Sequence, residues 1–97
     1  EFGRTAHVNG TGGTDHGTGG VAFLLGGAVA GGRGVADWPG LSPAKLFEGR
    51  DLMPTTDLRA VAKAVLIDHL RLPATAVEAQ VFPQSAGARP LPRLVRA

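Results

Sequence analysis

Residues 56–70 read TDLRAVAKAVLIDHL and carry the clearest structural pattern in the chain. Their large apolar residues recur along one face at helical spacing: Leu58, Val61, Val65, Leu66 and Leu70. This recurrence matches 3.6 residues per turn and predicts an amphipathic helix over 56–70. Thr55 or Thr56 is the expected N-cap, and Asp57 suits the positive end of the helix dipole. Pro73 is expected to end the helix.

The chain before this helix is rich in glycine. Twelve of the 15 glycines precede residue 35, and seven of them fall within residues 1–20, which predicts an irregular loop there. Residues 21–25 (VAFLL) form a short apolar run between glycines. Such a run is typical of a strand buried on both faces.

Three further elements are expected after residue 40. Ser42 and Pro43 suit the start of a short helix that Gly49 would close. Residues 77–82 are expected to form an edge strand. Residues 84–97 are expected to form a flexible Pro/Arg-rich tail.

Together these elements predict an α/β fold in which a glycine-rich loop, a buried strand, an amphipathic helix and an edge strand follow one another. One strand and one long helix supply little core for 97 residues. The chain also starts abruptly at Glu1, with neither an initiator Met nor a signal peptide. We therefore expect a C-terminal portion of a longer protein whose upstream part completes the domain.

Composition excludes several classes of protein. The chain has no Cys, which rules out disulfide scaffolds and Cys-based zinc sites. No apolar run approaches the roughly 18–20 residues that a membrane span needs. The net charge is +2, yet Arg89, Arg93 and Arg96 all lie in the last stretch, and the rest of the chain carries −1. With 5% aromatics and no basic face, nucleic-acid binding is not expected.

Motifs for common chemistries are also missing. The two serines, Ser42 and Ser85, do not form a Gly-x-Ser-x-Gly elbow, and there is no Gly-Lys-Ser/Thr for a phosphate-binding loop. Residues 17–22 match G-x-G-x-x-A, but they lead into the apolar run and do not open a helix. A dinucleotide site is therefore rejected.

Asp15 and His16 are the strongest candidates for chemistry. Residues 14–17 read TDHG, which puts a carboxylate and an imidazole side by side in a glycine-rich loop. Oxygen and nitrogen donors of this kind suit Zn²⁺, Mn²⁺ or Fe²⁺. The alternative is structural: Asp15 would form an Asx turn, and His16 would be an exposed loop histidine.

The TDHG loop before an apolar strand resembles the metal-binding Asp-His-Gly of the alkaline phosphatase and sulfatase superfamily. More closely, the chain up to Pro83 resembles the C-terminal part of domain-of-unknown-function family 1501, bacterial proteins related to the sulfatase fold and often exported by the twin-arginine route. The segments that carry this resemblance are 1–5 (EFGRT), 13–17 (GTDHG), 25–27 (LGG), 31–32 (GG), 38–41 (WPGL), 55–57 (TTD) and 81–83 (VFP).

The resemblance implies a fold, a site and a location. Residues 1–83 would be the C-terminal part of an alkaline phosphatase/sulfatase-like α/β domain. Asp15 and His16 would be its late ligands for a divalent metal (Zn²⁺, Mn²⁺ or Ca²⁺). The guanidinium of Arg4 suits bidentate pairing with the oxyanion of an ester substrate; the alternative is a structural ion pair or a solvated side chain. The superfamily's nucleophile and remaining ligands have no counterpart here. Of the other histidines, His69 is expected to be a helix-end residue beside the dipole, and His7 stays open as a ligand that no motif supports. A periplasmic or exported location is also implied.

Two functions are compatible with this reading. The intact protein would be a metal-dependent hydrolase of sulfate or phosphate esters, of which this chain alone is inert. The alternative is a binding or structural module of the bacterial envelope that keeps the fold without catalysis.

Overall fold

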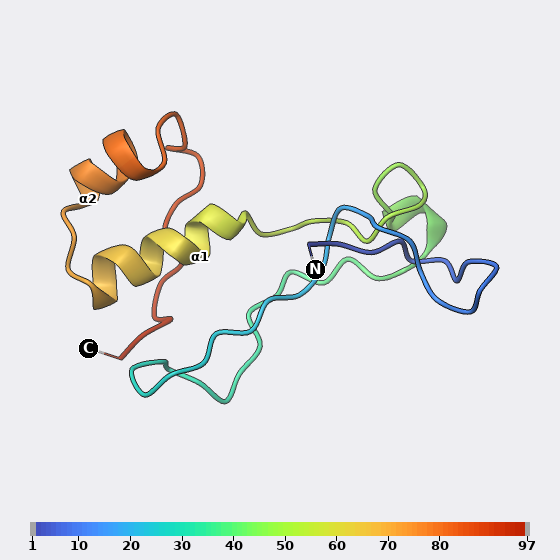
Figure 1. Cartoon of the computed structure of the whole chain (residues 1–97), viewed down its shortest axis with the longest axis horizontal. Helices are drawn as coiled ribbons and strands as arrows, with labels where there is room; N and C mark the ends of the chain where they lie inside the picture. Colours follow the sequence, from blue (N-terminus) through green and yellow to red (C-terminus); the bar gives the residue numbers. More distant parts are fainter. Residues whose placement is uncertain (1, 97) are drawn as a thin grey trace. The chain divides into compact units, whose positions relative to one another are not determined.

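The computed structural model describes residues 2–96, which form two compact units (Figure 1). Unit 1 comprises residues 2–23 and 35–56, and unit 2 comprises residues 24–34 and 57–96. The helical elements in chain order are η1 (Pro43–Lys45), α1 (Leu58–Ala64), η2 (Val65–His69), α2 (Ala74–Ala76) and η3 (Val77–Val81). No helix within residues 2–96 is long and apolar enough to cross a bilayer.

The predicted helix over 56–70 is confirmed as α1 followed directly by η2. Its N-cap is Asp57 and neither threonine: Asp57 Oδ1 accepts a hydrogen bond from the Arg59 backbone N–H at 2.9 Å. From Val65 onward the turns widen to a π-helix, in which Leu70 N donates to Val65 O at 3.1 Å. Arg71, with a φ of 59°, then leaves the helical conformation.

The buried face of α1 differs from the predicted apolar stripe. Ala60, Lys63 and Ala64 are buried, whereas Leu58 is 52% and Leu70 56% exposed. The buried residues stand at i, i+3 and i+4, so they share one face of the helix. Two of them are alanines, whose small side chains let neighbouring backbone approach closely.

Lys63 joins α1 to the segment that follows it. Its side chain has no exposed surface, and its Nζ donates to Glu78 Oε2 at 2.9 Å and to Ser85 O at 2.7 Å. A buried ammonium is tolerated only when it is paired and hydrogen-bonded, and both conditions hold here. The long stem of Lys63 therefore fills a core position while its charge bridges two elements.

The predicted edge strand over 77–82 is wrong. These residues continue α2 as the π-helical η3, and Phe82 N donates to Val77 O at 2.9 Å. In the sequence VEAQV, apolar and polar residues alternate, as they do in a strand with one buried face. The same sequence also places Val77 and Val81 four residues apart, on one side of a helix. Ala, Glu and Gln between them favour the helix.

Residues 84–96, expected to form a flexible tail, fold back within unit 2 (Figure 1). Leu91 N donates to Ala60 O of α1 at 3.2 Å. Further along, Ala30 N donates to Leu94 O at 2.9 Å and Arg96 N donates to Ala28 O at 2.7 Å. The burial of Ala88 and Leu94, together with these hydrogen bonds, holds the segment in place.

The predicted buried strand over residues 21–25 is also wrong. Within residues 2–96 this run takes part in no backbone hydrogen bond, and Val21, Phe23 and Leu25 are 76%, 82% and 88% exposed. An apolar run becomes a strand only where neighbouring strands accept and donate its hydrogen bonds. Extended segments of the described chain pair only through isolated bridges, so the α/β class stays a prediction.

The short helix predicted after Ser42 is a single 3₁₀ turn, η1. Ser42 stands at the N-cap position but its side chain makes no capping bond. A tight turn follows: Glu48 and Gly49 have φ values of 54° and 70°, and Phe47 pairs with Asp51 as in a short hairpin. This turn brings residues 50–52 back to the start of the chain.

Candidate functional site

Three segments of unit 1 support the candidate site. Residues 3–6 pair with residues 15–19 and with residues 50–52. Arg4 N donates to Gly19 O at 3.0 Å, Gly19 N donates to Leu52 O at 3.0 Å, and Leu52 N donates to Arg4 O at 3.2 Å. These bonds close a ring, so each segment is held by both others.

Glycine is required where these segments cross. A Cβ added to Gly17 would lie 2.5 Å from Arg4 C and 2.6 Å from Arg4 O, and one added to Gly3 would lie 2.5 Å from Gly17 O. Real Cβ atoms essentially never come this close to backbone. The glycine of the Asp-His-Gly sequence thus lets the loop lie against residues 3–5.

The crossing brings all three predicted site residues together. Arg4, Thr14, Asp15 and His16 line a shallow hollow of about 400 Å³. Arg4 and His16 face each other as an antiparallel bridge, and Arg4 Nη1 donates to Thr14 O at 2.6 Å. Arg4, Asp15 and His16 are all exposed. Three residues with polar, ionisable side chains therefore border one exposed hollow.

Asp15 is held from both its backbone and its side chain. Its backbone N donates to Thr5 Oγ1 at 3.1 Å, and its Oδ1 accepts from Asn9 Nδ2 at 3.0 Å. The alternative Asx turn at Asp15 is not found, because Gly17 N donates to Gly3 O at 3.0 Å. The Asx turn belongs instead to Asn9, whose Oδ1 accepts from Thr11 N at 3.0 Å.

A second acidic residue of unit 1, Asp51, is not predicted from the sequence. Asp51 is only 2% exposed, and its carboxylate accepts from Thr18 Oγ1 at 2.5 Å and from Arg50 Nε at 2.8 Å. These bonds, with that to Thr18 the larger cause, lower the pKa of Asp51. The charged carboxylate links residues 15–19 to residues 50–52. Because Thr18 and Asp51 are 33 positions apart, no short motif in the sequence indicates their contact.

The donors in the hollow fit part of a metal site. Asp15 and His16 supply the carboxylate oxygen and imidazole nitrogen that Zn²⁺ or Mn²⁺ takes as ligands. Within residues 2–96, no group of three or more His, Cys, Asp or Glu side chains is gathered for a metal. Two donors make half of a tetrahedral zinc shell.

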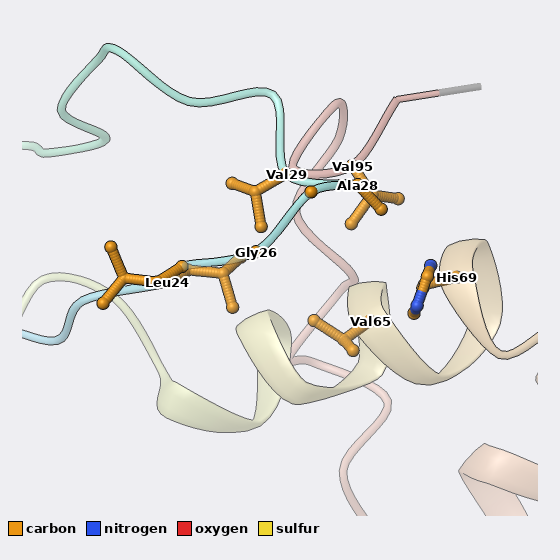
Figure 2. A pocket seen from close by; sticks show the side chains of 9 residues that line it. Leu24, Gly26, Ala28, Val29, Val65, His69 and Val95 are labelled. Carbon is orange, nitrogen blue, oxygen red and sulfur yellow. The ribbon is translucent and has the colours of Figure 1, made fainter.

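Neither of the other two histidines is among the residues that line this hollow. His7 is exposed in a loop of unit 1. His69 ends η2 in unit 2, where it borders a separate hollow of about 300 Å³ with Val65 and the Leu24–Val29 segment (Figure 2). This lining is mostly aliphatic, and the expectation that His69 is not a ligand of the Asp15 site stays a prediction.

The arrangement of residues 4 and 14–17 falls inside a region shared with other proteins. The profile of the family described as Protein of unknown function (DUF1501) matches residues 1–81. The chain belongs to the DUF1501 family. No curated protein and no solved structure matches it. Membership covers every residue of the hollow, and the family description names no activity.

Proposed function

We propose that the hollow of Arg4, Asp15 and His16 is the chain's contribution to a site that binds a divalent metal and an anionic sulfate or phosphate ester, in a metal-dependent hydrolase. The antiparallel bridge between Arg4 and His16 supports the proposal, because it places a cationic side chain next to the Asp-His pair. The proposal includes export of the parent protein to the periplasm and completion of the site by upstream residues.

The roles follow from the chemistry of the three side chains. Asp15 and His16 would each donate one ligand atom to Zn²⁺ or Mn²⁺. The metal would polarise an ester oxygen and stabilise negative charge during transfer. Arg4 is suited to an ester anion, since a guanidinium donates several hydrogen bonds to phosphate or sulfate oxygens. One of these donors is already fixed by Thr14 O, which orients the guanidinium plane.

The test is a zinc titration of the 97-residue chain followed by amide proton–nitrogen spectra. We expect signals of residues 14–17 and of Asn9 to shift, while those of unit 2 stay in place. Asp15→Asn and His16→Gln should each abolish the response.

His7→Gln is the matched control, because His7 is another exposed loop histidine of the same unit. Its zinc response should equal that of the unaltered chain. Spectra unmoved by Zn²⁺ and Mn²⁺ would contradict the proposal. Binding of metal and of an aryl phosphate by the intact parent protein, without turnover, would support the non-catalytic module instead.

A further inference from the structure

Asn9 has the most extensively bonded side chain of the loop before Asp15. Its Oδ1 accepts three hydrogen bonds, from Thr11 N at 3.0 Å, Thr11 Oγ1 at 2.8 Å and Gly13 N at 3.0 Å. Its backbone N also donates to Gly13 O at 2.7 Å. The carbonyl end of this one side chain therefore closes the loop of residues 9–13.

The other end of the same amide contacts Asp15, the candidate metal-binding residue. Asn9 Nδ2 donates to Asp15 Oδ1 at 3.0 Å. An amide oxygen only accepts and an amide nitrogen only donates, so the three donors around Oδ1 fix which end faces Asp15. Within residues 2–96, Oδ2 of Asp15 makes no hydrogen bond.

We propose that Asn9 is a positioning residue. Its side-chain oxygen closes the 9–13 loop, and its side-chain nitrogen holds Oδ1 of Asp15, which leaves Oδ2 of Asp15 to bind the metal. The inference deepens the proposed function and rests on it for the identity of that metal ion. A carboxylate held in one rotamer loses less conformational freedom on binding. Hydrogen-bonded partners of metal-binding side chains act in this way.

Asn9→Asp separates positioning from loop closure. A carboxylate at residue 9 keeps an oxygen for Thr11 and Gly13, but it has no donor for Asp15 and repels it. A purely structural role for Asn9 predicts that this variant behaves as the unaltered chain. A positioning role predicts that the loop persists while Asp15 is released.

The readout is the χ1 rotamer of Asp15, measured from three-bond couplings in the 97-residue chain without metal. We expect one rotamer in the unaltered chain and averaging among rotamers in Asn9→Asp, with the Gly13 amide signal unchanged. Thr11→Val is the control, since it removes one donor to Oδ1 and leaves the bond to Asp15. A single Asp15 rotamer in Asn9→Asp would overturn the proposal.

Two further measurements decide the matter if Asn9→Asp does not fold. Averaging of Asp15 in the unaltered chain would by itself overturn the proposal. In Asp15→Ala, one side-chain amide proton of Asn9 should lose its hydrogen-bond shift while the Gly13 amide stays in place. An Asn9 side-chain amide signal that is the same in Asp15→Ala and in the unaltered chain would also overturn the proposal.

Measuring zinc affinity separates this inference from the proposed function. Asn9→Ala should weaken zinc binding about tenfold, as losing a supporting hydrogen bond does at other metal sites. An unchanged affinity would overturn the positioning role. If the unaltered chain binds no zinc, the proposed function fails, and the Asp15 rotamer alone decides the role of Asn9.

Discussion

Lys63 carries a charged side chain that is fully buried. A fully enclosed ammonium depends on Glu78 and on the Ser85 carbonyl, so truncation removes the stem that fills the core and unpairs both partners. We expect Lys63→Ala to lower the free energy of unfolding of unit 2 by about 3 kcal/mol. Urea denaturation followed by circular dichroism at 222 nm measures this change.

Two variants show how much of that loss in stability comes from the buried stem of Lys63 and how much from its ion pair. Lys63→Met keeps most of the stem and should cost less than the alanine change. Glu78→Gln keeps an acceptor oxygen for Nζ, and Glu78 is partly open to water, so its effect should be the smallest of the three. Equal stabilities of Lys63→Ala and the unaltered chain would show that the bridge does not stabilise the helices.

Among the elements, α1 begins at a carboxylate that responds to acid. Hydrogen bonds from the Arg59 side chain, and then from its backbone N–H, lower the pKa of Asp57 from 3.8 to about 2. Because the folded pKa is the lower one, this stabilisation is complete above about pH 4 and is lost as the pH falls toward 2. We expect the melting temperature, followed at 222 nm, to fall over that window.

Asp57→Asn identifies the Asp57 share of the acid response. Asparagine caps helices well but does not titrate. The variant should be less stable than the unaltered chain at pH 7, and the difference should shrink between pH 4 and pH 2. A difference that does not change with pH would contradict the assignment.

The paired segments of unit 1 depend on the absence of a side chain at Gly17. In Gly17→Ala the new Cβ would collide with the Arg4 backbone, so residues 3–6 and 15–19 must separate. We expect faster hydrogen exchange at the amides of Arg4 and Thr5, which donate to Gly19 O and Asp15 O. Gly10→Ala is the control, because nothing lies within 4 Å of a Cβ added there. Equal exchange in the two variants would disprove the close crossing.

The sequence predicts elements well where the signal is local. The helix over 56–70 is found because its caps and its period lie within the helix itself. The prediction for residues 21–25 is wrong because a strand depends on partners distant in the sequence. The prediction for residues 77–82 is wrong because one pattern of apolar residues fits both the strand period and the helix period. The burial of Lys63 is missed because apolar periodicity ignores a polar residue on the buried face.

The site is predicted in part for the same reason. Arg4, Asp15 and His16 stand in short motifs, and the structure brings them to one hollow. Asn9 was overlooked although Asn-Gly is a strong turn signal, because its second bond reaches six residues along the chain. Asp51 depends on a contact 33 residues away and has no local pattern.

For the whole molecule, we predict that the 97-residue chain does not hydrolyse aryl phosphate or aryl sulfate esters in the presence of Zn²⁺ or Mn²⁺. Under the proposed function its hollow offers two candidate metal ligands and one guanidinium, which would bind metal and ester without completing the hydrolytic chemistry. A chromogenic ester assay at high protein concentration measures the rate, with Asp15→Asn as the control. Turnover that disappears in this variant would show that the chain is an enzyme by itself.

The division into two units gives each unit its own optical signal. The single Trp of the chain, Trp38, lies in unit 1, whereas α1, η2, α2 and η3 lie in unit 2. Indole fluorescence therefore reports one unit and far-ultraviolet ellipticity mainly the other, in the same sample. Superimposable denaturation curves would identify one cooperative transition, and displaced curves would give each unit a midpoint of its own.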